Sequence, residues 1–186
     1  MLTKAAAVLL AIVVASGGVA LAARLGGPKK DPGAAVLLAS RAQTTGCARG
    51  PNPNRDCSPG AYAKKLTKSV ICAGKGKFTT DDYRYVPDSE KRDVEAEYGM
   101  STTKKYGKSL EIDHIVSLEL GGSNDIANLF PEGKFAHPGY KVKDALETRI
   151  AHLVCEGKMN LRTVQRRMAT DWQALYTEIF GKSPAG

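Results

Sequence analysis

An aspartate and a histidine stand next to each other near the middle of the chain, as Asp113 and His114, and Asn128 follows on the C-terminal side. An imidazole with an ordinary pKa can take a proton from water at neutral pH, so His114 is a candidate general base. A carboxylate is a hard ligand that suits Mg²⁺ or Mn²⁺, so Asp113 is a candidate metal ligand. Together they could activate water and stabilise negative charge on a phosphate.

The residues around this pair predict two short strands and a turn. β-Branched and polar side chains interleave over 111–116, a second short strand is predicted over 118–120, and Gly121 and Gly122 then break the chain. Neighbouring residues on a regular strand point to opposite faces, so Asp113 and its neighbour can serve one phosphate only where the strand twists or ends. We therefore expect an irregularity at this point.

Two amphipathic helices are predicted in the C-terminal third of the chain. The first covers 143–156, and the second lies between Asn160, a candidate N-cap, and Gly181, a candidate C-cap. Trp172 lies on the apolar stripe of the second helix and is predicted to be in the core. Short strands followed by helices predict an α+β protein, and its length suits one domain, which we place at 57–182.

Three short pieces follow one another in the centre of the chain: Asp113-His114-Ile115-Val116, then Gly121-Gly122, then Asn124-Asp125-Ile126-Ala127-Asn128-Leu129. In this order and spacing they resemble the HNH (ββα-metal, His-Me finger) endonuclease family, and most closely small exported bacterial HNH-like proteins. The resemblance implies a ββα-metal centre that hydrolyses phosphodiester bonds in DNA, with RNA as the alternative substrate, and with low sequence specificity. It also implies a divalent metal ion, Mg²⁺ or Mn²⁺ in the first place and Zn²⁺ or Ni²⁺ as alternatives.

The resemblance also assigns roles to individual residues. His114 would be the general base and Asp113 a metal ligand, while the side-chain amide of Asn128 would bind backbone groups and hold the loop that carries His114. Lys143 matches the start of the family's helix, where we expect it to contact a phosphate. Asp144 matches the same motif and is expected to cap the helix or support the site.

The chain departs from the family pattern at Lys141, where relatives carry a second metal-binding histidine. Two interpretations are open. His137 could supply the missing imidazole, or the ammonium group of Lys141 could stabilise the phosphate in place of a metal's charge. Lys141 also supports a rival hypothesis, in which the chain is a non-catalytic, basic nucleic-acid or cell-envelope binding protein on an HNH scaffold.

The N-terminus has the layout of a signal peptide. Lys4 precedes the apolar run 5–15, and Ala20-Leu21-Ala22 provides a small-residue cleavage site. We assign 1–23 to a signal peptide, with an uncleaved membrane anchor as the alternative, and 24–56 to a flexible linker. Either assignment places the folded part outside the cytoplasm, and a cleaved signal would leave no stable membrane association.

The net charge favours a polyanionic partner, and the cysteines favour disulfides. The chain has 27 Lys and Arg against 19 Asp and Glu, a formal charge of +8, and nucleic acid is the expected partner; no pattern identifies an immunity partner. Four cysteines in an exported protein predict two disulfides, and without a C-x-x-C pair a structural zinc site is not expected. Of three connectivities we favour Cys47 with Cys57 and Cys72 with Cys155.

Overall fold

The computed structural model describes residues 29–74, 76–100, 110–133 and 138–184; the predicted signal segment, 1–23, lies outside them. In chain order the elements are β1 (Ala35–Leu37), β2 (Ala61–Ala63), α1 (Lys68–Ile71), α2 (Thr80–Tyr83), α3 (Asp88–Glu97), β3 (Leu110–His114), the 3₁₀ turns η1 (Leu118–Leu120) and η2 (Ile126–Asn128), β4 (Leu129–Gly133), α4 (Tyr140–Cys155) and α5 (Leu161–Phe180). The predicted α+β class is confirmed, with short antiparallel strand pairs and two long C-terminal helices.

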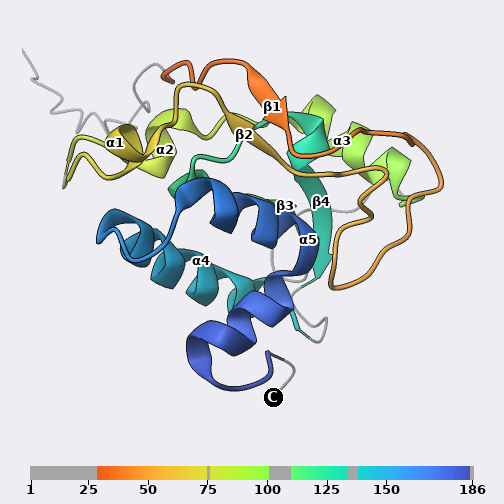
Figure 1. Ribbon diagram of the computed structural model, residues 1–186. Coiled ribbons are helices and arrows are strands. Elements are labelled where there is room, and N and C mark those ends of the chain that lie inside the picture. The colour runs from red at the N-terminus through yellow and green to blue at the C-terminus, as the bar shows by residue number, and fades with distance from the viewer. Residues whose placement is uncertain (1–28, 75, 101–109, 134–137, 185–186) are drawn as a thin grey trace, which may run out of the picture.

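The centre of the fold is the antiparallel pair β3–β4, followed along the chain by α4. In its register Asp113 lies opposite Phe130, and His114 lies opposite Leu129. Helices α4 and α5 lie side by side against one side of this pair, while α3 lies beyond β4 (Figure 1). Strand β2 pairs with β1 and also bridges to Gly122 in the β3–β4 connection. This bridge ties the β3–β4 connection to the first sheet.

The partner of β3 differs from the one predicted. Residues 118–120, predicted as a strand, form the 3₁₀ turn η1, and the strand that pairs with β3 is β4. Strand β4 reads Leu-Phe-Pro-Glu-Gly, and its proline lacks the N–H group that a ladder normally uses, so sequence patterns argue against a strand there. The expected irregularity is present, because β3 ends at His114.

Both predicted C-terminal helices are confirmed. The side chain of Asn160 accepts a hydrogen bond from the backbone N–H of Thr163 at 3.1 Å, which caps the start of α5. Gly181, with φ of 67°, ends the same helix in the left-handed conformation. Trp172 is 1% exposed and lies in the core, as predicted.

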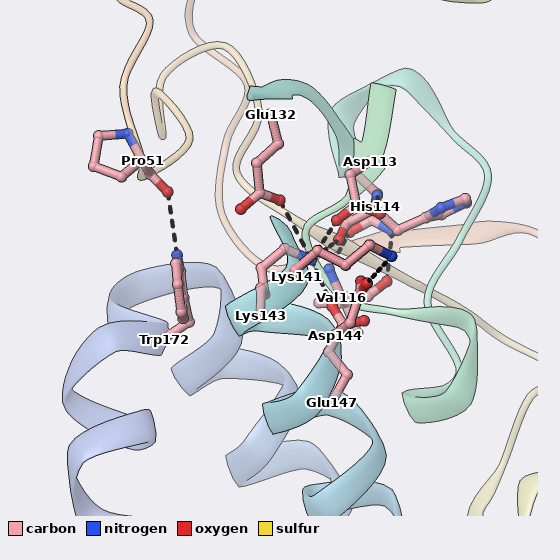
Figure 2. A network of polar contacts seen from close by, with 11 residues as sticks. Pro51, Asp113, His114, Val116, Glu132, Lys141, Lys143, Asp144, Glu147 and Trp172 are labelled. Carbon is pink, nitrogen blue, oxygen red and sulfur yellow. Dashed lines mark hydrogen bonds and ion pairs between the residues drawn. The ribbon is translucent and has the colours of Figure 1, made fainter. Parts of the chain in front are cut away.

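The predicted flexible linker, 24–56, differs from the structure in its described part, 29–56. This segment contributes β1 to a sheet, and the side chain of Arg41 forms an ion pair with Glu97 on α3. The indole N–H of Trp172 donates a hydrogen bond to the carbonyl oxygen of Pro51 at 3.3 Å (Figure 2). The folded unit therefore begins before residue 57, because contacts with distant elements hold a segment whose own composition suggests a linker.

The cysteines pair as predicted. Cys47 is bonded to Cys57, and Cys72 at the end of α1 is bonded to Cys155 at the end of α4. Two disulfides are typical of an oxidising, extracellular environment. Among the described residues, none of the helices has the length and apolar character needed to cross a membrane.

Candidate functional site

A buried lysine is the hub of the polar cluster beneath β3. Lys143, on the first turns of α4, is 1% exposed, and its ammonium nitrogen lies 2.5 Å from Asp113 Oδ2 and 2.6 Å from Glu147 Oε1. It also donates a hydrogen bond to the carbonyl oxygen of His114 at 3.1 Å, and it lies 3.8 Å from Glu132 Oε2 (Figure 2). One cation thus lies among three carboxyl groups.

The charges of this cluster follow from burial and from the lysine. Burial alone would raise the pKa of Asp113, but the attraction of Lys143 lowers it below its usual value. Burial would lower the pKa of Lys143, but the carboxyl groups around it, Asp113 first among them, raise it well above its usual value. Burial raises the pKa of Glu132 to about 9 and that of Glu147 to about 8. The Lys143 cation therefore pairs with an ionised Asp113, while burial favours the neutral form of Glu132 and of Glu147.

His114 is held as a neutral imidazole. It is 3% exposed, and burial lowers its pKa to about 4. Its Nε2 lies 3.1 Å from Asn124 Oδ1, and the amide nitrogen of Asn124 donates to the carbonyl oxygen of Tyr83 at 2.8 Å. Because the second bond fixes Oδ1 of Asn124 as the acceptor, Nε2 of His114 carries the hydrogen and Nδ1 carries the lone pair. The ring therefore has one nitrogen able to accept a proton, although its pKa is lower than the ordinary value assumed from sequence.

Asn128 holds the loop that follows His114. Its Oδ1 accepts hydrogen bonds from the backbone N–H groups of Ala61 and Val116, each at 3.0 Å. Its Nδ2 donates to the carbonyl oxygens of Val116 at 3.0 Å and Ser123 at 2.7 Å. All of its hydrogen-bonding capacity goes to backbone groups, so Asn128 is a positioning residue that ties the loop to β2.

A group of three carboxylates lies at the edge of the buried cluster. Oxygen atoms of Glu111, Asp113 and Asp144 lie within 4.8 Å of one another. Burial and the nearby charges of Asp113 and Asp144 raise the pKa of Glu111, as expected where acids crowd together. Lys141 is exposed, and its ammonium nitrogen lies 3.1 Å from Asp144 Oδ2. Three clustered hard ligands fit a divalent cation such as Mg²⁺ or Mn²⁺, with Lys141 beside them.

A groove of about 410 Å³ opens beside His114. Residues from the segment after α2, from α3 and from β3 line it: Arg84, Tyr85, Val86, Lys91, Glu111, Ile112 and His114. Arg84 also borders a smaller cavity, of about 140 Å³, that includes Asp144 and Glu147. The exposed Arg84 thus lines both the groove beside His114 and the cavity beside Asp144 and Glu147.

The structure brings together most of the predicted site residues and changes the role of one. Asp113, His114 and Asn128 lie in one region, and Lys141 lies at its edge through Asp144. Lys143 does not lie where a substrate phosphate could reach it, because it is on the core-facing side of α4. The predicted phosphate contact is therefore replaced by a buried ion pair. The predicted metal ligand His137 lies outside the described residues.

Two contributors were missed by sequence reasoning. Glu132 is 0% exposed in a strand whose first four residues are all buried, so no alternation pattern marks it. Arg84 lies far from the central run in sequence, and only the fold brings it to the groove. An exposed arginine followed by tyrosine is an ordinary surface pattern, and no sequence signal would have identified it.

Comparison of the chain with protein-family models, with curated proteins and with solved structures finds no match.

Proposed function

We propose that this protein is an exported, metal-dependent endonuclease of the HNH type, which hydrolyses phosphodiester bonds in DNA, with RNA as the alternative substrate, and with low sequence specificity. The observation that carries the proposal is the arrangement around His114. A neutral imidazole with a fixed tautomer lies at the end of β3 and lines the same groove as Glu111, a member of the carboxylate group. The order strand, strand, helix around it matches the ββα arrangement that the sequence resemblance implies.

In the proposed reaction His114 acts as the general base. Its Nδ1 accepts a proton from a water molecule in the groove, and the oxygen of that water attacks the phosphorus atom. The leaving oxygen departs with the electron pair of the broken P–O bond and takes up a proton from solvent water. Asn124 keeps the hydrogen on Nε2, and Asn128 fixes the backbone that follows the ring. These two amides set which nitrogen is basic and where it lies.

The charge of the phosphate is balanced from two directions. Arg84 and Lys91 line the groove and would attract the strand's phosphates. Glu111, Asp113 and Asp144 would hold a divalent cation, which when bound supplies a Lewis acid for the phosphate oxygens. The formal charge of +8 over the whole chain supports a polyanionic substrate. Export is supported by the signal-like N-terminus together with the two disulfides.

One observation favours a second candidate, a basic binding protein that uses this scaffold without catalysis. The ammonium group of Lys143 lies 2.5 Å from Asp113 Oδ2, so part of that carboxylate's charge is already neutralised. Lys141 likewise neutralises part of the charge of Asp144, at the edge of the carboxylate group. If these lysines satisfy the carboxylates, the protein would bind nucleic acid without needing a metal ion.

Plasmid nicking tests the two candidates. Purified protein is incubated with supercoiled plasmid in Mg²⁺, in Mn²⁺ or in chelator, alongside the His114→Ala and His114→Gln variants. We expect metal-dependent nicking by the wild type and a loss of about 10²-fold or more in rate for both variants. The matched control is His152→Ala, because His152 lies on the exposed face of α4 and outside the groove residues.

Circular dichroism separates lost catalysis from lost folding, since His114 is buried and its removal leaves space in the core. Folded variants that nick plasmid as fast as the wild type would reject His114 as the base. A wild type that retains DNA but nicks none of it in any metal would instead establish the binding-protein candidate.

A further inference from the structure

The segment that follows α2 places an exposed aromatic ring at the mouth of the groove. Tyr85 is 64% exposed, the most exposed of the large hydrophobic side chains among the described residues, and it lines the groove together with His114. Single exposed apolar residues are common on protein surfaces and alone indicate nothing. Here, however, the ring lines the same groove as the cationic side chains of Arg84 and Lys91 and as His114, the candidate general base.

This segment is fixed relative to His114 by a side chain that contacts both. Asn124 lies 3.1 Å from His114 Nε2 and donates a hydrogen bond at 2.8 Å to the carbonyl oxygen of Tyr83, the last residue of α2. Arg84 then adopts an extended backbone, and Pro87 restricts the end of the segment before α3 begins. The backbone that leads to Tyr85 is therefore tied to the imidazole through Asn124.

The chemistry around the ring matches one class of ligand. Arg84 is the neighbour of Tyr85 in the chain, and Lys91, which also pairs with Asp88, lines the same groove, so the aromatic side chain shares the groove with two cations. Stacking of bases on aromatic rings, combined with cations along the backbone, is how proteins bind single-stranded nucleic acid. The groove volume of about 410 Å³ is in the range of sites that hold a small molecule, which suits one nucleotide.

The bases of a duplex are less able than those of a single strand to stack on the Tyr85 ring. Within a duplex both faces of each internal base are covered by the neighbouring base pairs, so a protein ring can stack on an internal base only where that base is unpaired. We propose that Tyr85 is a stacking platform for an unpaired base and Arg84 a contact for the adjoining phosphate, which makes single-stranded nucleic acid the preferred ligand of this groove. This inference rests on the proposed function only in placing the adjoining phosphate next to His114.

Binding measurements test the proposal separately from cleavage. Fluorescence anisotropy with chelator present compares a labelled oligo(dT) of about twelve nucleotides with a blunt duplex of the same length. We expect the wild type to bind the single strand more tightly. Tyr85→Ala should weaken single-strand binding about tenfold and leave duplex binding within about twofold, whereas Tyr85→Trp should retain single-strand binding. Arg84→Gln should weaken both ligands and reduce the salt dependence of binding.

The matched control is Phe180→Ala, which removes another exposed aromatic ring, 37% exposed, at the end of α5. It should bind both ligands as the wild type does. Unchanged single-strand binding by Tyr85→Ala, or an equal loss for both ligands, would overturn the proposal. Its failure is distinct from failure of the proposed nuclease: a protein that never nicks plasmid can still show the Tyr85-dependent preference, and an active nuclease can lack it.

Discussion

At the scale of single residues, two lysines two positions apart have different physical roles. Lys143 is buried with Asp113, and a buried charge without its partner carries an uncompensated desolvation cost. Lys141 pairs with Asp144 at the surface, where water screens the interaction. The first lysine therefore holds the candidate site together, and the second is available to a ligand.

The contrast gives a prediction for the matched pair Lys143→Met and Lys141→Met. Lys143→Met leaves the carboxyl group of Asp113 buried without its cation, so we expect a loss of about 3–5 kcal/mol in the free energy of unfolding, measured by urea denaturation. Lys141→Met is the control and should leave the urea midpoint nearly unchanged. Similar losses for the two variants would show that the buried ion pair does not stabilise the fold.

The raised pKa of Glu132 predicts how the stability of the protein depends on pH. Its folded pKa is raised from 4.5 to about 9, mainly by burial, so between these values the folded protein holds a proton that the unfolded chain releases. The contribution of Glu132 to stability is therefore lost as pH rises through this window. Glu132→Gln keeps a neutral side chain of the same shape, so we expect a smaller fall in stability between about pH 6 and pH 8.5.

The fall should not vanish in Glu132→Gln, because the pKa of Glu147 is also raised, to about 8. The control is Glu156→Gln, since the contact with Lys158 lowers the pKa of Glu156 and keeps its titration below the window. Urea unfolding at both pH values checks the prediction. An unaltered slope in Glu132→Gln would mean that Glu132 is ionised in the folded protein.

At the scale of elements, the turn after η1 sets the path of the loop that follows β3. Gly121 has φ of 73°, and its N–H donates a hydrogen bond to the carbonyl oxygen of Leu118 at 3.0 Å. A Cβ atom added at Gly122 would lie 1.7 Å from the carbonyl oxygen of Val116, closer than any real contact. Only glycine at this position lets the chain pass close enough for Asn128 to bind Val116.

We therefore expect Gly122→Ala to unfold the β3–β4 connection and to cost more than about 2 kcal/mol in stability. Gly50→Ala is the control, because its added Cβ would lie 3.9 Å from the nearest atom and its φ is not positive. Urea denaturation of both variants measures the difference. A stable Gly122→Ala protein would require the loop to take another path.

Sequence patterns predicted the elements whose signals lie within their own residues. The caps at Asn160 and Gly181 and the apolar stripe bearing Trp172 all belong to the helix that they predict, and the structure agrees with them. Strand β4 was missed because its proline and uniform burial hide the period of a strand. The Asp113–Lys143 pair was missed because it depends on how α4 packs against β3, which no local pattern encodes.

At the scale of the whole molecule, two disulfides join segments that differ greatly in their distance along the chain. Cys47 and Cys57 are 10 residues apart, whereas Cys72 and Cys155 are 83 apart and connect α1 with α4. The first closes a loop within segment 29–58, and the second encloses β3, β4 and the whole candidate site. The second crosslink therefore constrains far more of the unfolded chain.

A crosslink lowers the entropy of the unfolded chain more when it closes a longer loop. By that relation we expect the Cys72→Ala/Cys155→Ala variant to lose about 4.5 kcal/mol of stability and the Cys47→Ala/Cys57→Ala variant about 3 kcal/mol. Urea denaturation of the two double variants measures the difference, and alkylation followed by mass spectrometry checks that the non-reduced wild type has no free thiol. Each variant removes both cysteines of a pair, so no lone thiol remains to form a new bond. The reverse order of losses would therefore show that strain or residual structure, and not loop length, governs the stability that these disulfides add.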